Sequence, residues 1–231
     1  MSRFAEIEAQ PAAIAILEHA LESGRVASAY LFEGPSGVGK ELAAVALAEA
    51  VIGADDKTKA RIRSGAHPDV QTFRPRDEGK RNIQVTALRE QILPVAQFAP
   101  FEASAAFLIF PEADVSFPEH PPESANAVLK TLEEPRPGVH FVLTSERPDR
   151  LLPTIRSRGQ RVRFGRLPAD VLDRILAARD VPDEARGPAV ALADGRADRA
   201  IALAEGGAPP GAAGIALGNT GFVVHSIAIC T

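Results

Sequence analysis

A glycine-rich loop between a short apolar run and an alanine-rich segment constrains the fold of this chain more than any other feature. The loop fits the pattern G-x-x-x-x-G-K, and its residues are Gly34, Pro35, Ser36, Gly37, Val38, Gly39 and Lys40. The run at 29–32 predicts a strand before it, and the segment from Glu41 predicts a helix after it. Backbone N–H groups, the helix N-terminus and a lysine ammonium in this context predict a phosphate site. The alternative is a turn that holds no ligand.

Apolar and amphipathic segments alternate after the loop. Three short apolar runs predict strands and two stretches with one-sided apolar spacing predict helices, in chain order 69–73, 86–92, 107–110, 123–134 and 141–145. This alternation predicts an α/β fold with a parallel sheet flanked by helices. The uninterrupted run at 107–110 is typical of a central strand that helices cover on both faces.

From Pro168 onward the pattern indicates helices only, with breaks at Pro182 and Gly195. We therefore expect three regions: an α/β P-loop domain over 1–166, a small three-helix domain over 167–207, and a tail or truncated edge over 208–231. About forty residues of helix are too few to be stable alone, so the second domain should dock on the first.

Composition narrows the function classes. The single cysteine, Cys230, excludes an internal disulfide and a cysteine zinc site, and no apolar run reaches the roughly 20 residues of a membrane span. With no secretory signal at the start, we expect a cytoplasmic protein without a membrane partner. The net charge of −4 argues against a general nucleic-acid binder, so any DNA contact should be local or indirect.

Two positions argue against efficient metal-dependent hydrolysis. Glu41 stands where a Ser or Thr hydroxyl normally binds Mg²⁺, and its charge would repel phosphates unless Mg²⁺ bridges them. A first-turn acid favoured by the helix dipole is the alternative reading of Glu41. After the run at 107–110, Pro111 takes the place of a metal-holding acid, although Glu112 could still face a nucleotide.

Four segments resemble the clamp-loader branch of the AAA+ proteins, and within it the delta-prime type of bacterial DNA polymerase III subunit. They are AYLFEGPSGVGK at 29–40, His-Pro-Asp-Val at 67–70, ANAVLKTLEEP at 125–135 and LLPTIRSRGQ at 151–160. The last two are similar to the family signatures NALLKTLEEP and TIRSRCQ, and order and spacing agree over about 8–207.

The resemblance implies an AAA+ domain followed by a three-helix lid, within a hetero-pentamer that loads a sliding clamp on primed DNA. Its implied partners are motor subunits of the tau/gamma type, a delta subunit and, through the assembly, the clamp and DNA. Family members continue into a helical collar domain, and this sequence ends about where the collar would begin.

The resemblance also implies roles for single residues. Arg158 matches the Arg of the Ser-Arg-Cys motif, which acts as an arginine finger on ATP held by a neighbouring subunit. The alternative for Arg158 is a surface charge, because the region 147–166 is rich in arginine. Asp198 falls where motor subunits carry a phosphate-contacting lid arginine. Thr144 matches a sensor position that could bond a phosphate or water, but it is equally an ordinary strand-end threonine.

We therefore expect weak or absent binding of ATP or ADP, Mg²⁺ only together with nucleotide, and no zinc. The leading hypothesis is a non-hydrolysing scaffold subunit of the DNA polymerase III holoenzyme, a nucleotidyltransferase, that donates Arg158 in trans. One alternative is an active AAA+ ATPase in which Lys40, Glu41 and Glu112 manage the metal in an unusual way. Another is a truncated paralogue that no longer assembles.

Overall fold

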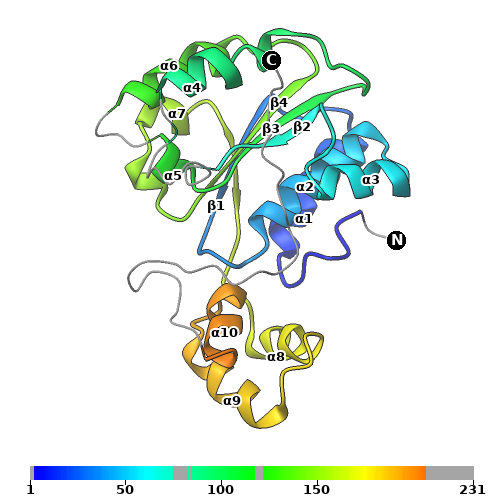
Figure 1. Cartoon of the computed structure of the whole chain (residues 1–231), viewed down its shortest axis with the longest axis vertical. Coiled ribbons are helices and arrows are strands. Elements are labelled where there is room, and N and C mark those ends of the chain that lie inside the picture. Colours follow the sequence, from blue (N-terminus) through cyan, green and yellow to red (C-terminus); the bar gives the residue numbers. More distant parts are fainter. Residues whose placement is uncertain (1–2, 75–82, 84, 118–121, 207–231) are drawn as a thin grey trace, which may run out of the picture.

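The computed structural model describes residues 3–74, 83, 85–117 and 122–206, and at its centre lies a five-stranded parallel sheet (Figure 1). Neighbouring strands follow the order β2-β3-β4-β1-β5. The strands are β1 (Ala29–Glu33), β2 (Val70–Thr72), β3 (Ala106–Phe110), β4 (Val139–Ser145) and β5 (Gln160–Arg163). The predicted α/β class is therefore confirmed. The tail predicted over 208–231 lies outside the described residues.

Helices cover both faces of the sheet (Figure 1). One side carries α1 (Pro11–Glu22), α2 (Lys40–Ile52) and α3 (Asp56–Arg63). The other carries α4 (Val85–Ala87), a π-helical turn η1 (Leu88–Ile92), the 3₁₀ turn η2 (Val95–Gln97), α5 (Ala113–Ser116), α6 (Glu123–Glu133), the 3₁₀ turn η3 (Pro148–Arg150) and α7 (Pro153–Arg156). Within the described part of the chain, no helix is long and apolar enough to cross a bilayer.

The alternation of side chains along β1 divides the core into two layers. Tyr30 and Phe32 pack on the α2 side with Leu47, whereas Leu31 packs with Val128 of α6 on the other side. All five residues of β1 are buried, as are all five of β3. Burial on both faces explains why these strands are continuous apolar runs.

Three further helices form a compact group beyond β5 (Figure 1). They are α8 (Ala169–Ala177), α9 (Asp183–Leu192) and α10 (Ala197–Ala204). Leu172 and Leu176 of α8 share a buried cluster with Val38 of the glycine-rich loop. The group therefore packs against the end of the sheet where that loop lies.

The edge strand β5 and the helix α3 were not predicted from the sequence. β5 reads Gln-Arg-Val-Arg, and only Val162 of its four residues is buried. Arg161 lies against the neighbouring strand and donates to both oxygens of Glu33, at 2.7 and 2.8 Å. Charged side chains of this kind protect a sheet edge from pairing with other chains, and they also conceal the strand from an apolar pattern.

The buried carboxylate of Asp69, just before β2, fixes a loop at the far edge of the sheet. It accepts hydrogen bonds from the backbone N–H groups of Phe101, Glu102 and Ala103, at 2.5, 2.8 and 2.9 Å. We expect Asp69→Ala to lower the free energy of unfolding by about 3 kcal/mol in urea denaturation, because three part-buried backbone N–H groups lose their shared acceptor. Asp56→Ala, which removes an exposed carboxylate, is the control, and equal effects of the two substitutions would contradict the account.

Candidate functional site

The glycine-rich loop leaves the carboxyl edge of the sheet between β1 and α2. Its first N–H group, from Gly34, donates to the Ser145 carbonyl at the end of β4, at 3.1 Å. A Cβ on Gly34 would lie 2.3 Å from the Phe164 carbonyl oxygen, so only glycine fits there. Gly39 precedes α2 with φ of 95°, a left-handed conformation that glycine adopts without strain. The predicted strand, loop and helix are all present, at the edge where parallel α/β sheets bind ligands.

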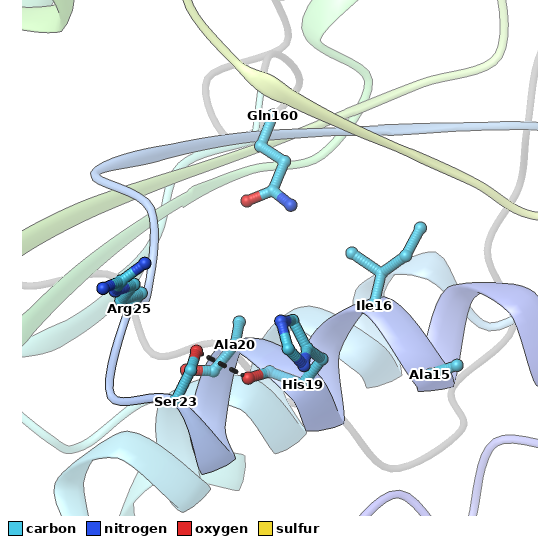
Figure 2. A pocket seen from close by; sticks show the side chains of 7 residues that line it. All are labelled: Ala15, Ile16, His19, Ala20, Ser23, Arg25 and Gln160. Atoms are coloured by element: carbon cyan, nitrogen blue, oxygen red, sulfur yellow. Dashed lines mark hydrogen bonds between the residues drawn. The ribbon is translucent and has the colours of Figure 1, made fainter.

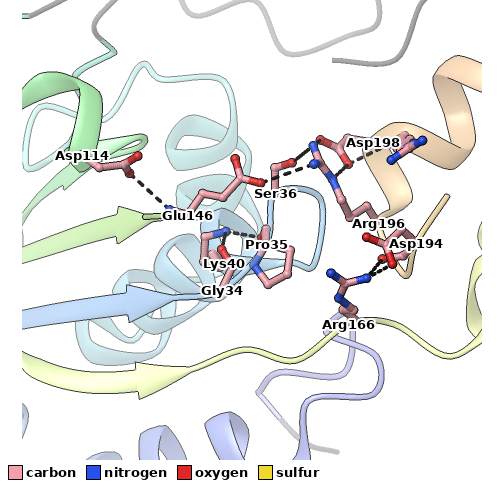
Figure 3. Close-up of polar contacts among 11 residues, drawn as sticks. Gly34, Pro35, Ser36, Lys40, Asp114, Glu146, Arg166, Asp194, Arg196 and Asp198 are labelled. Carbon is pink, nitrogen blue, oxygen red and sulfur yellow. Dashed lines mark hydrogen bonds and ion pairs between the residues drawn. The ribbon is translucent and has the colours of Figure 1, made fainter. Parts of the chain in front are cut away.

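The ammonium group of Lys40 is turned back onto its own loop. It donates to the carbonyl oxygen of Gly34 at 2.7 Å and to that of Pro35 (Figure 3). The residue is 8% exposed, and this burial lowers the pKa of its amine to about 8, although nearby carboxylates oppose the shift. The ammonium group therefore lies within the loop, and its binding of a phosphate stays a prediction.

We refer to α8, α9, α10 and the residues that join them as the lid, and the start of α10 bonds directly to the outer part of the loop. Ser36 donates its hydroxyl proton to the Asp198 carboxylate at 2.7 Å and accepts a hydrogen bond from the Arg196 guanidinium (Figure 3). Arg196 and Asp198 also pair with each other, at 3.2 Å. We refer to Ser36, Arg196 and Asp198 together as the lid latch.

Backbone contacts bring the lid still closer to the loop. The Ala197 N–H group, at the start of α10, donates to the Gly37 carbonyl at 3.1 Å. A Cβ on Gly37 would lie 2.3 Å from a carboxylate oxygen of Asp198, so a larger residue would push the lid away. Burial alone would raise the pKa of Asp198, but hydrogen bonds from Arg196 and Ser36 outweigh it and hold the pKa below its usual value. Asp198 is therefore an anion at neutral pH.

Glu41 does not face the loop as an uncompensated charge. Its carboxylate forms an ion pair with Arg74, which follows β2. A cation in direct contact with Glu41 offsets much of the repulsion that we predicted between this carboxylate and a phosphate. Local sequence patterns do not predict this pair, because the two residues are 33 positions apart.

Three other acids lie near the strand ends. Glu112 follows the buried Pro111, has a left-handed backbone conformation and is exposed. Asp114 instead accepts from the Glu146 N–H group at 3.2 Å, and both carboxylates act electrostatically on Lys40 (Figure 3). Glu146 also pairs with Arg196 of the lid, at 3.3 Å. Asp114, Glu146 and Asp198 therefore all act electrostatically on the loop lysine, and the expected approach of Glu112 to a nucleotide stays a prediction.

Thr144 lies inside β4, one residue before its end, and is 5% exposed beside Phe32 of β1. The hydroxyl of the next residue, Ser145, is buried and has no hydrogen-bond partner in the described part of the chain. The sensor role of Thr144 stays a prediction.

Arg158 lies at the opposite end of the sheet from the loop. Its guanidinium donates to the Thr154 carbonyl at 2.6 Å and forms an ion pair with Glu133 at the end of α6. Two other arginines of the same sequence segment, Arg161 and Arg166, pair with Glu33 and Asp194 within the chain. The basic segment is thus partly neutralised internally.

Three residues of the site were missed by sequence reasoning: Arg196, Glu146 and Asp114. They come from the lid, from the residue after β4 and from α5, and only the fold brings them together. One sequence feature could have indicated part of this site. Arg196 and Asp198 are two positions apart at the start of a predicted helix, where both side chains can contact the same residue of another segment.

Comparisons with known proteins agree with one another. The family model described as "DNA polymerase III, delta subunit" matches residues 9–168. The chain is similar to the DNA polymerase III subunit delta' of Bacillus subtilis, with 35% identity over 188 residues, 78% of this chain and 55% of that protein. The Pseudomonas aeruginosa delta' subunit is also 35% identical, over 72% of this chain and 50% of its own length. The chain thus spans about half the length of these relatives.

Solved structures share the fold at lower identity. A DNA polymerase III gamma subunit-related protein of Thermotoga maritima has a TM-score of 0.59 and 22% identity, covering 82% of this chain and 57% of its own. The RuvB Holliday junction branch migration motor of the same organism has a TM-score of 0.55 and 18% identity, over 84% and 58%. At these identities the comparison supports the AAA+ fold alone.

The lowered pKa of Lys40 predicts a stability change at alkaline pH. Above pH 8 the folded state releases this proton, while the unfolded chain keeps it until its ordinary value near 10.5, so the unfolded state binds more protons and stability rises with pH. Relative to Lys40→Met, the wild type should gain about 2 kcal/mol in free energy of unfolding between pH 8 and 10. Urea denaturation of both proteins at several pH values measures this, and parallel curves would contradict it.

Proposed function

The chain belongs to the DNA polymerase III delta-prime family of AAA+ clamp-loader subunits, and we propose that it acts in DNA replication as a non-hydrolysing scaffold. In this proposal the α/β domain over 1–166 and the lid over 167–207 hold one subunit position in the loader. Arg158 is its catalytic contribution, acting in trans on ATP bound by a neighbouring motor subunit.

The position of Arg158 relative to the chain's own loop is the observation that carries this proposal. β5 runs parallel to β1, with Gln160 beside Tyr30 and Arg163 beside Glu33. Arg158 precedes the start of β5, whereas the loop follows the end of β1. The paired region from Gln160 to Arg163 spans three residue steps of about 3.3 Å each, so the start of β5 and the end of β1 are about 10 Å apart. This separation supports a role of Arg158 toward a phosphate that another subunit holds rather than toward the chain's own loop.

The contacts of Arg158 are compatible with such a role. Its partner Glu133 is 47% exposed in the side chain, and exposed ion pairs contribute only about 0–1 kcal/mol. Exchange of Glu133 for a triphosphate is therefore favourable, because the guanidinium gains a more highly charged partner with matching oxygen geometry.

The contacts of the chain's own loop support the absence of hydrolysis. The lid latch sets an anionic carboxylate, Asp198, against Ser36 and Gly37. Pro111 supplies no ligand where a metal-holding acid is expected. ATP or ADP with Mg²⁺ would meet this carboxylate, so the proposal includes weak or absent nucleotide binding and no turnover by the isolated chain.

The proposed partners follow from the family. A gamma/tau subunit of Mycobacterium tuberculosis is 32% identical over 75% of this chain and 30% of its own length, so motor subunits of related fold are the proposed neighbours. A delta subunit, the sliding clamp and primed DNA complete the proposed assembly.

A second candidate function is an active AAA+ ATPase. Two observations favour it: Arg74 neutralises Glu41, and Asp114 lies close enough to influence Lys40. Mg²⁺-dependent turnover by the isolated chain, abolished by Lys40→Ala, would support this function and contradict the scaffold role.

Arg158→Ala tests the proposed role in a loader reconstituted from this chain with its motor subunits, delta subunit, clamp and primed DNA. We expect at least a tenfold loss of clamp-stimulated ATP turnover, because the developing phosphoryl charge loses its cation. Arg158→Lys should lose nearly as much, since an ammonium lacks the planar fork of donors. Arg150→Ala, in the same basic segment, is the control, and full turnover by both Arg158 variants would refute the role.

A further inference from the structure

A hollow of about 410 Å³ lies between α1 and the first residue of the edge strand β5 (Figure 2). Ile16 and Ala20 of α1 supply apolar lining, with His19 on the same helix. Gln160 points into the hollow from β5, and Arg25 lies at its edge on the connection to β1 (Figure 2). The hollow is within the size range of small-ligand and side-chain pockets.

The way α1 is attached to β5 explains why the hollow is open. Gln10, just before α1, donates to the Gly165 carbonyl and accepts from the Gly165 N–H group, both at 2.8 Å. These bonds tie the start of α1 to the far end of β5. The end of α1 near Ser23 has no such bond to β5, and the hollow lies there.

Three polar side chains that line this hollow have no hydrogen-bond partner in the described part of the chain. Among the described residues, no hydrogen bond or ion pair engages the side chains of His19, Arg25 or Gln160. The Ser23 hydroxyl, by contrast, donates to the His19 carbonyl at 2.7 Å. Arg25 offers a guanidinium, Gln160 an amide N–H₂ group and His19 a ring N–H group, so the lining supplies donors for one bound group.

The charge of the lining indicates what that group is. Arg25 is always positively charged, and no carboxylate from the described part of the chain lines the hollow. On α1, the acid closest in direction to the lining face is Glu22, and it does not line the hollow. Because successive residues of a helix are about 100° apart, Glu22 points about a quarter turn away from the centre of that face. A carboxylate with a short apolar stem matches both the donors and the apolar floor.

We propose that this hollow receives an acidic side chain of the neighbouring motor subunit, within a segment that lies along the exposed edge of β5. The proposal rests on the proposed function, because it takes its partner from the trans role of Arg158. Gln160 is two residues from Arg158, at the same end of the sheet. A subunit that brings its ATP to Arg158 therefore also meets the hollow. In this proposal the contact at the hollow holds the neighbouring subunit in place, and Arg158 stabilises the charge on the phosphate that this neighbour binds.

The affinity between full-length chain and motor subunit tests the contact, measured by fluorescence with one partner labelled. Arg25→Glu should weaken assembly at least tenfold in 50 mM salt, and the effect should fall below about threefold in 500 mM salt, because exposed charges are screened. Lys57→Glu is the matched control, since it makes the same charge change on α3 outside the hollow. Unchanged affinity for Arg25→Glu, or an equal loss for Lys57→Glu, would overturn the proposal.

A photo-crosslinker identifies the occupant. With p-benzoylphenylalanine in place of Ala15, which lines the hollow, the assembled loader should give a crosslink to an Asp- or Glu-containing peptide of the motor subunit. A crosslink to a second copy of this chain, to the clamp or to DNA, or no crosslink, would overturn the proposal.

The two proposals fail separately. Arg158→Ala should leave the assembly affinity unchanged, and Arg25→Glu should recover full ATP turnover at saturating motor subunit. Normal assembly by Arg25→Glu together with lost turnover by Arg158→Ala would reject the hollow alone. Weakened assembly by Arg25→Glu together with full turnover by Arg158→Ala would reject only the catalytic role of Arg158.

Discussion

The contact of the lid with the glycine-rich loop is the interaction on which the rest of this structure depends. Asp198 and Arg196 both bond to Ser36, and the backbone of α10 bonds to Gly37. These bonds fix the lid relative to the sheet through groups of the protein itself. Protein groups alone therefore make the contacts between the lid and the loop, which supports the proposed scaffold role.

The same contact sets the electrostatics of the loop. Two cations, Lys40 and Arg196, face three carboxylates, those of Asp114, Glu146 and Asp198, which gives the cluster a formal charge of 2 − 3 = −1. The lysine ammonium is already bonded to loop carbonyls. A triphosphate would bring further negative charge into this partly buried cluster, where charges interact more strongly than in water. The proposed role of Arg158, at the far end of the sheet, would avoid this conflict.

Sequence reasoning found the parts of the fold that depend on local patterns. The loop, the buried strands β1 and β3 and the lid helices follow from apolar spacing and glycine positions, which neighbouring residues determine. It missed β5, because three of its four side chains are exposed and two are arginines. It also missed the pairing of Glu41 with Arg74 and the place of Glu146, because those contacts join residues far apart in the chain. Asp198 was identified through a family pattern, but its bond to Ser36 required the fold.

The affinity of the isolated chain for ATP, measured with a fluorescent analogue, tests the importance of the lid latch most directly. Asp198→Ala should bind at least tenfold more tightly than the wild type, a gain of about 1.4 kcal/mol, because a like charge is removed and Arg196 is released toward the phosphates. Asp194→Ala, which removes a lid carboxylate paired with Arg166 instead, should bind as the wild type does. Equal or weaker binding by Asp198→Ala would contradict the proposal that the lid latch weakens nucleotide binding at this loop.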